Sequence, residues 1–355
     1  MTEGKSPAEG KPSNRKAVTL RDLVLRPGGI THVLETIGQF IEYVGRTRQE
    51  WQEEDSNLKL NDDQRLLNSS SLVGQVWFRG HRQCDLSLKP GLYRSETSEK
   101  LLKKDRSPSS HDEGLLFAEL MDLEHEQRID FISYGHLLNA ANQAKTQIDW
   151  YFLMQHHGVP TRLLDWTTNA LAALFFGLDS YGRKGRTGEN SGENSDCIAV
   201  WMMDAYWLAD RLSEDWYGPM LPWSADALEY VPQLEQLLEK PSYSKRIVPA
   251  EAMPIEPPAM HPRVAAQEGR FIIFGRERDL LDHEIELEKT DACEDEKARI
   301  VQVRFKVGDL NSLLEELADL GVSNRTMFPD LGGLADFIRW KHFHKVGGYN
   351  LETGG

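Results

Sequence analysis

The sequence predicts an α+β fold, with a mixed or antiparallel central sheet and helices around it. Short apolar runs typical of buried strands occur beside longer segments whose apolar residues recur every three or four positions. The two kinds of segment do not show the regular strand–helix–strand alternation of a doubly wound parallel sheet. The sequence contains neither a GxGxxG motif nor a phosphate-binding P-loop that would suggest such a sheet.

Helices are predicted wherever apolar residues keep the helical spacing. These segments are 30–45, 112–132, 146–158, 167–178, 309–321 and 328–343. Gly45 is predicted to end the first helix, and Gly158, with Pro160 just beyond it, to end the third. The fourth helix is short, almost wholly apolar and preceded by threonine and asparagine residues that could cap it, so we expect it to be buried.

Strands are predicted at short runs of apolar and β-branched residues. These runs are 76–78, 161–166, 197–203, 270–275 and 298–307. The last two are joined by a very acidic connection at 284–297, which we interpret as the solvated loop of a hairpin.

The composition along the chain predicts a flexible tail at 1–26 and a single domain over 27–355. The tail is rich in glycine, proline, serine and lysine. Residues 182–196 have low complexity and are predicted to form a flexible loop. Residues 205–262 are rich in proline and tryptophan, and we interpret them as an irregular insertion that covers one edge of the core, a candidate lid.

Charge and cysteine content exclude several classes of protein. The chain has 355 residues and a formal net charge of −15, which opposes general binding to nucleic acid or to an anionic membrane. No apolar run approaches the roughly 18 residues needed to span a bilayer, and the first residues lack the apolar core of a secretory signal. The three cysteines form no CxxC pair, so we expect free thiols and a cytoplasmic protein.

Arg79 and Gly80 interrupt the apolar pattern of the predicted strand at 76–78. An isolated arginine at the end of a strand often pairs with a carboxylate, which is the simplest interpretation. The alternative is that the planar guanidinium lies at the floor of a pocket, because it can bind a phosphate or carboxylate with two hydrogen bonds. In that interpretation Gly80 lets a ligand approach the backbone.

Two further segments combine polar and apolar residues, 155–177 and 263–271. In the first, Arg162 and Asp165 are predicted to point to opposite sides of a strand. Trp166 and Thr167 follow where that strand meets a helix N-terminus, a position that favours anions; Thr167 could equally be a simple cap. The adjacent histidines of this segment cannot easily face one metal ion, because zinc ligands on a helix are three or four residues apart. No metal site is therefore expected.

Together these motifs resemble the FRG domain family, named for an aromatic-Arg-Gly motif. The motif here is Phe78-Arg79-Gly80, and the long segment 155–177 and the segment 263–271 are similar to the later signatures of the family. The resemblance spans roughly residues 30–340, which implies one FRG-type domain over 27–355. Members often occur in bacterial and phage-related contexts, which implies a role in stress or phage defence.

A second resemblance, to the ADP-ribosyltransferases, implies NAD as a substrate and a related fold. The order of segments is similar: aromatic-Arg-Gly, then a strand end before an apolar helix, then a carboxylate-bearing turn before a strand. The resemblance implies catalytic roles for Glu268, Gln267 or Asp165. The implied NAD-binding residues are Arg79, Gly80, Arg162, Trp166, Thr167 and Phe271.

Three functions follow as alternatives. The first is an NAD-consuming enzyme that transfers ADP-ribose to an unidentified macromolecule or to water, through an oxocarbenium-like state that a carboxylate stabilises. The second is a non-catalytic nucleotide-binding or sensing module, because Gln267 and Glu268 cannot share a face of an extended segment and a Glu-x-Glu turn is absent. The third, a metal-dependent nuclease, is disfavoured by the acidic chain and the lack of metal-ligand spacing.

Overall fold

The computed structural model describes most of the predicted helices and strands. The described residues are 33–57, 75–94, 110–138, 144–183, 197–212, 218–231, 249, 251–258, 262–276 and 299–343. The predicted tail, the low-complexity loop from residue 184 onward and the acidic connection lie outside these residues.

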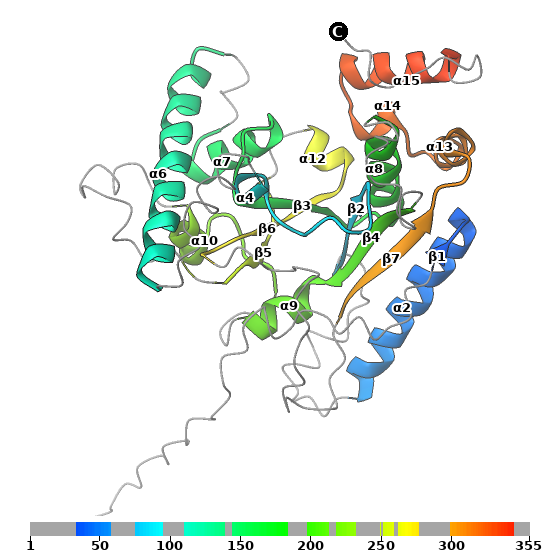
Figure 1. Cartoon of the computed structure of the whole chain (residues 1–355), viewed down its shortest axis with the longest axis horizontal. Helices are drawn as coiled ribbons and strands as arrows, with labels where there is room; N and C mark the ends of the chain where they lie inside the picture. Colours follow the sequence, from blue (N-terminus) through cyan, green and yellow to red (C-terminus); the bar gives the residue numbers. More distant parts are fainter. Residues whose placement is uncertain are drawn as a thin grey trace, which may run out of the picture.

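A seven-stranded sheet forms the centre of the molecule (Figure 1). Its strands are β1 (Val33–Leu34), β2 (Val76–His81), β3 (Leu163–Thr167), β4 (Cys197–Asp204), β5 (Met253–Ile255), β6 (Gly269–Ile273) and β7 (Ile300–Lys306). The order across the sheet is β1-β7-β4-β2-β3-β6-β5. Only the β1–β7 pair is parallel among these strands; the other five pairs are antiparallel. The fold is therefore α+β with a mixed sheet, as predicted.

Eleven helices of the described chain surround the sheet. They are α2 (Ile37–Asn57), α4 (Gly91–Arg94), α6 (Ser110–Gly135), α7 (Gln147–His156), α8 (Ala170–Arg183), α9 (Ala205–Leu212), α10 (Ala225–Tyr230), α12 (Pro262–Ala266), α13 (Leu310–Asp319), α14 (Asn324–Met327) and α15 (Leu331–Phe343). The predicted helices at 112–132, 146–158, 167–178, 309–321 and 328–343 correspond to α6, α7, α8, α13 and α15.

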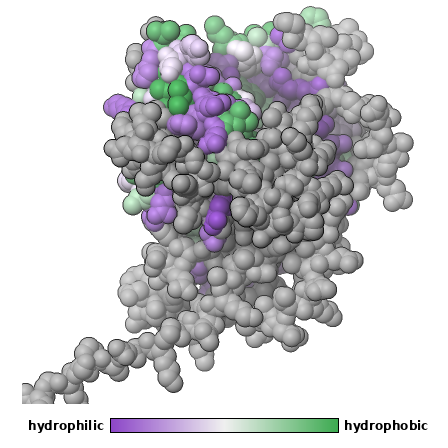
Figure 2. Space-filling model, turned by 60° about the vertical axis from the view of Figure 1, so that its left-hand side comes forward, coloured by the Kyte–Doolittle hydropathy of each residue, from purple (hydrophilic) through white to green (hydrophobic). Residues whose placement is uncertain are grey.

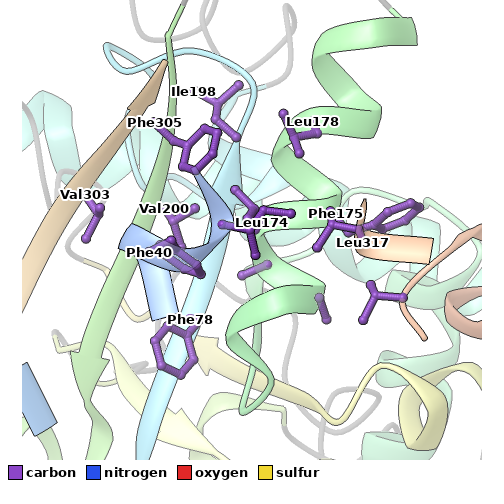
Figure 3. Close-up of a cluster of buried hydrophobic side chains, with 14 of the residues drawn as sticks. Phe40, Phe78, Leu174, Phe175, Leu178, Ile198, Val200, Val303, Phe305 and Leu317 are labelled. Carbon is purple, nitrogen blue, oxygen red and sulfur yellow. The ribbon is translucent and has the colours of Figure 1, made fainter. Parts of the chain in front are cut away.

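The helices form cores on both faces of the sheet. On one face, α2, α8 and α13 pack against β2, β4 and β7, and Phe40, Phe78 and Leu174 lie close together there (Figure 3). On the other face, Trp77 and Trp201 are fully buried among side chains of α4, α6 and α9. Successive residues of a strand point to opposite faces, which is why Trp77 and Phe78 enter different cores.

The prediction that Gly45 ends the first helix is wrong. Val33 and Leu34 pair with β7 as a short strand, and α2 continues through Gly45 to Asn57. Contacts beyond the glycine explain the continuation: the backbone oxygen of Trp51 accepts a hydrogen bond from Arg299 Nη2 at 3.3 Å, and Trp51 is buried. Tertiary packing therefore outweighs the modest cost of glycine within a helix.

The predicted hairpin between the strands at 270–275 and 298–307 is also wrong. These strands are β6 and β7, and they are not neighbours in the sheet. β6 lies between β3 and β5, whereas β7 lies between β1 and β4. Three strands, β4, β2 and β3, separate them, so the connection between them is not a tight hairpin.

The segment 205–262 adds more than irregular chain. Its described residues include α9, α10 and β5, and β5 forms one edge of the sheet by pairing with β6.

Among the described residues, no helix combines the length and apolar character that crossing a bilayer requires. Figure 2 shows a face on which the described hydrophobic residues are interspersed with hydrophilic ones.

Candidate functional site

The three segments singled out in the sequence lie on three neighbouring strands. The aromatic-Arg-Gly motif is on β2, Asp165 and Thr167 are on β3, and Glu268 directly precedes β6. Phe78 pairs with Thr167, and Thr167 pairs with Gly269 on its other side. Residues roughly 90 to 190 positions apart in the sequence therefore meet in the middle of the sheet.

Arg79 lies where β2 and β3 separate. In the described chain these strands share a single residue pair, Phe78 with Thr167. Next to that pair, Arg79 Nη1 donates a hydrogen bond of 2.6 Å to the backbone oxygen of Asp165. The same nitrogen lies 3.9 Å from Asp165 Oδ2. The guanidinium thus donates to the backbone oxygen of Asp165 at a point where β2 diverges from β3 and its backbone does not reach that oxygen.

His81 holds the other side of the guanidinium. Arg79 Nε donates to His81 Nε2 at 2.9 Å, so this ring nitrogen is the acceptor. The remaining ring nitrogen, Nδ1, lies 3.2 Å from the backbone oxygen of Leu86 and must carry the proton that it donates there. The chain of bonds from Leu86 through His81 fixes the orientation of Arg79.

The electrostatics around Arg79 favour an anion. Burial lowers the pKa of Arg79 to about 10, and Asp165 opposes this shift, so Arg79 remains charged at neutral pH. Arg94, on α4, is close enough to lower the pKa of Arg79 as well. The Arg79 side chain is 14% exposed and that of Asp165 is 57% exposed. Two cations therefore surround one solvent-accessible carboxylate, which leaves a net positive charge at the surface.

Asp165 is oriented from α7. Gln155 Nε2 donates to Asp165 Oδ2 at 2.9 Å, and Thr161 Oγ1 donates to Gln155 Oε1 at 2.5 Å. Gln155 is the first residue of the segment 155–177, but nothing in the sequence pattern distinguishes it from the neighbouring histidines. We call Arg79, His81, Arg94, Gln155 and Asp165 the arginine cluster.

Glu268 occupies a strained turn at the N-terminus of α8. It has a φ of 47°, and it alone among the described non-glycine residues has a positive φ. Its carboxylate accepts hydrogen bonds from Thr168 Oγ1 at 2.7 Å and from Asn169 Nδ2 at 3.3 Å. Asn169 also caps α8, through bonds from the backbone nitrogens of Leu171 and Ala172. The negative charge of Glu268 therefore lies at a helix N-terminus.

Gln267 points away from this turn. Its Nε2 donates to the backbone oxygen of Met327 at 2.9 Å, which attaches it to α14. Its own backbone oxygen accepts from Thr167 Oγ1 at 2.6 Å. Thr167 is buried, and its hydroxyl also accepts from the backbone nitrogen of Asn169 at 3.0 Å. Of the two adjacent candidates, only Glu268 presents a carboxylate at the end of β3.

Arg162 has a structural environment. Its side chain is fully buried, and its Nε bonds both carboxylate oxygens of Glu124, at 3.1 and 3.0 Å. Nη1 donates to the backbone oxygen of Phe274 at 2.9 Å and Nη2 to that of Tyr230 at 2.6 Å. The hydroxyl of Tyr151 donates to Glu124 and accepts from the backbone nitrogen of Arg162. Every nitrogen of this guanidinium has a protein partner, which fits a role in joining α6 to the sheet.

Three other candidates contribute to packing. Trp166 is buried in the same cluster as Trp77, and Phe271 packs edge-on against Phe152 with ring centroids 4.9 Å apart. Gly80 faces α8: a Cβ built on it would lie 1.9 Å from the backbone oxygen of Ala173. The close approach that Gly80 permits is therefore that of a helix.

The described residues contain no group of three or more histidine, cysteine, aspartate or glutamate side chains arranged to hold a metal ion. The arginine cluster and the Glu268 turn lie near Asp165 and Thr168, which are three positions apart along β3 and its continuation. At about 3.3 Å per residue, their backbones are roughly 10 Å apart. A ligand that contacts both must extend over that distance, as a nucleotide does.

Residues 74–185 match the model of the FRG domain. The match runs from the start of β2 to the end of α8, so it includes Arg79, Asp165 and the cap of α8. It ends before Glu268 and β6. No curated protein and no solved structure matches the chain.

Proposed function

We propose that this FRG domain protein binds a nucleotide-type anion at the arginine cluster, and that NAD is that nucleotide. The observation that carries the proposal is the guanidinium of Arg79, held by His81 and the backbone of Asp165 where β2 and β3 separate. Arg79 Nη2 has no hydrogen-bond partner among the described residues. A planar guanidinium with one uncommitted nitrogen, beside the second cation Arg94, suits a phosphate oxygen.

The remaining polar groups of the cluster suit a ribose. The exposed carboxylate of Asp165 can accept hydrogen bonds from two neighbouring hydroxyl groups, and Gln155 keeps it oriented. Arg79 and Arg94 would hold the pyrophosphate. The extended shape of NAD then allows its other end to reach the Glu268 turn along β3.

We further propose that the bound NAD is cleaved, because Glu268 provides a carboxylate at that position. The bond from C1′ of the ribose to nicotinamide breaks, and its electron pair leaves with neutral nicotinamide. The oxocarbenium-like ribose that develops is stabilised by the carboxylate of Glu268. Water, or a nucleophile of an acceptor macromolecule, then bonds to C1′ and loses a proton. The first outcome is NAD glycohydrolysis and the second is ADP-ribosyl transfer.

A non-catalytic nucleotide-binding module is the second candidate function. It is favoured by the bonds that Glu268 already makes to Thr168 and Asn169, which hold its carboxylate against the protein. In that case the cluster senses a nucleotide and releases it unchanged.

Calorimetric titration of the full chain with NAD tests the binding proposal. We expect saturable binding that Arg94→Ala weakens about ten-fold, the effect of losing one charge-assisted contact. Arg46→Ala is the matched control, because Arg46 is an exposed arginine of α2 and we expect no change. Arg79→Lys keeps a charge near the carbonyl of Asp165 but loses the planar fork, and we expect it to weaken binding too. Absence of saturable binding of NAD, or equal binding by all variants, would overturn the proposal.

Nicotinamide release, followed by chromatography together with the mass of the protein, separates the two functions. We expect release that falls at least a hundred-fold in Glu268→Gln and is unchanged in Glu42→Gln, a matched exposed glutamate of α2. A gain in protein mass indicates transfer, and free ADP-ribose indicates hydrolysis. Binding of NAD without any release would favour the sensing module.

A further inference from the structure

The helix α15 has apolar residues on two opposite sides. On its inner side, Trp340 is buried in the core that includes α8 and α13, and Gly333 is buried too. On its outer side, Leu331, Leu334 and Ile338 are exposed. Figure 1 shows α15 at the top of the molecule, outside α14. A helix that is apolar all round is normally buried all round, so the outer side is a candidate interaction surface.

The exposed residues form a continuous stripe along α15. Successive residues of a helix are about 100° apart around its axis, so Leu331, Leu334 and Ile338 lie within about 60° of one another. Their exposed fractions are 83%, 38% and 48%. Ala335 is exposed beside them, and its small side chain lets another helix approach closely. We call Leu331, Leu334, Ala335 and Ile338 the outer stripe.

Opposite charges mark the two ends of the outer stripe. Asp330 directly precedes α15, and Lys341 lies in its last turn. They are eleven residues apart, about three turns, so both project from the same edge of the stripe. The carboxylate of Asp330 accepts from the backbone nitrogen of Gly333 and pairs with Arg263, yet 39% of its side chain stays exposed. Lys341 is exposed as well. Each end can therefore receive a further charge of the opposite sign.

We propose that α15 pairs with α15 of a second copy of this chain, in antiparallel orientation about a two-fold axis. Such an axis, perpendicular to both helices, reverses the second helix but keeps each edge of the stripe on its own side. Lys341 of one copy then lies beside Asp330 of the other, and symmetry repeats this pair. In the same register Leu334 faces Ile338 of the second copy, and Ala335 lies close to its own counterpart.

This self-complementarity identifies the second copy as the occupant. An antiparallel pair joins opposite charges at both ends of the contact, whereas a parallel pair would bring Lys341 against Lys341. The chain has a net charge of −15, which opposes association at long range. At physiological ionic strength that repulsion is screened beyond about 8 Å, so the contacts of the stripe decide the outcome. An anionic membrane would repel the chain without offering a partner for Asp330.

The size of the surface sets the expected affinity. α15 has 13 residues and is about 20 Å long. Standard protein interfaces use about 20–30 residues from each partner, far more than one side of α15 offers. We therefore expect a weak dimer, with a dissociation constant on the order of 10 μM. Because both copies use the same patch, association closes at two subunits.

Sedimentation velocity of the full chain, from about 1 to about 200 μM in physiological salt, tests the proposal. We expect a reversible shift from monomer to dimer. Leu331→Glu and Ile338→Glu should each weaken the dimer at least ten-fold, because each places a charge in the apolar contact. Both positions are exposed in the monomer, so its fold should be retained. The matched control is Leu137→Glu: Leu137 follows α6 and is also 83% exposed, and we expect no change. Lys341→Glu should weaken the dimer most at low salt, where its repulsion from Asp330 is least screened.

Oxidative cross-linking of introduced cysteines tests the orientation of the helices. In the antiparallel pair, Ala335→Cys places two thiols close together across the two-fold axis and should give a disulfide-linked dimer. Leu331→Cys places its two thiols about 15 Å apart along the helix axes, beyond the roughly 7 Å between Cα atoms that a disulfide can bridge. The unmodified chain, with its three cysteines, gives the background.

A monomer at every concentration would overturn the proposal, and so would a dimer that Leu331→Glu and Ile338→Glu leave intact. Assembly beyond two subunits would exclude the closed two-fold contact. Cross-linking through Leu331→Cys as readily as through Ala335→Cys would contradict the antiparallel orientation. None of these measurements involves NAD, so they bear on the pairing of α15 independently of the proposed function.

Discussion

Replacing Gly80 with alanine should destabilise the protein far more than a single methyl group normally does. The added Cβ would lie 1.9 Å from the backbone oxygen of Ala173 and 2.7 Å from the backbone nitrogen of Gly177. Real Cβ contacts are essentially never closer than 3.0 Å, so α8 must retreat by more than an ångström. Both clashing atoms belong to the helix backbone and cannot rotate away. Overpacking usually costs about 1–3 kcal/mol, and we expect a value at or above the top of this range.

The motion would also disturb the core in Figure 3, where Leu174, Phe175 and Leu178 of α8 pack against strand residues. Urea unfolding followed by tryptophan fluorescence measures the change in the free energy of unfolding. Gly45→Ala provides the matched control: no atom lies within 4 Å of its added Cβ, so we expect it to stabilise α2 by about 0.5–1 kcal/mol. A loss of less than 1 kcal/mol in Gly80→Ala would refute the reasoning.

Three further substitutions test other interactions of the described residues, each by urea unfolding. Glu268→Gly should leave the free energy of unfolding unchanged or raise it by up to about 1 kcal/mol, because glycine adopts a φ of 47° without strain. A fall in the free energy of unfolding would mean that the contacts of the carboxylate outweigh the strain. Arg162→Met should cost about 3–5 kcal/mol, since it leaves the buried carboxylate of Glu124 unpaired, and adding Glu124→Gln should recover part of the loss. Asp330→Ala should cost about 0.5–1 kcal/mol at pH 7 by uncapping α15. The backbone hydrogen bond from Gly333 lowers the pKa of Asp330 in the folded protein. The stability that Asp330 contributes is therefore present above about pH 3.8 and is lost as the pH falls through the lower pKa of the folded state. If Asp330→Ala cost as much stability at pH 2 as at pH 7, the charged cap would not be the source of the effect.

Local sequence patterns predicted the positions of helices and strands better than they predicted which strands lie side by side. The apolar spacing of 112–132 and the apolar run of 197–203 correspond to α6 and β4. The prediction that the first helix ends at Gly45 was wrong because a glycine is a weak stop signal when residues beyond it are buried in the core, as Trp51 is. The failure of the β6–β7 hairpin has another cause. Alternating apolar residues define a strand face, but they do not specify which strand lies alongside.

The part of the candidate site that could be predicted is the part that lies within a single sequence motif. The sequence pointed to Arg79, and the structure places the exposed Asp165 beside it. It could not distinguish Arg79 from Arg162, because both arginines adjoin apolar strand residues. The difference is set by distant residues: Glu124, on α6, neutralises Arg162 inside the core. His81 was missed because its role depends on a hydrogen bond to the chain beyond β2.

The aromatic-Arg-Gly motif can be understood from the alternation of side chains along β2. Phe78 and Gly80 both face α8, where the ring fills the core and the missing side chain admits the helix backbone. Arg79 lies between them and faces the other way, toward the gap left by β3. Two of the three residues are therefore committed to packing the sheet against α8. Arg79 is the one charged residue of the motif, and it is not buried together with a neutralising carboxylate. Any ligand chemistry of the motif must therefore depend on Arg79.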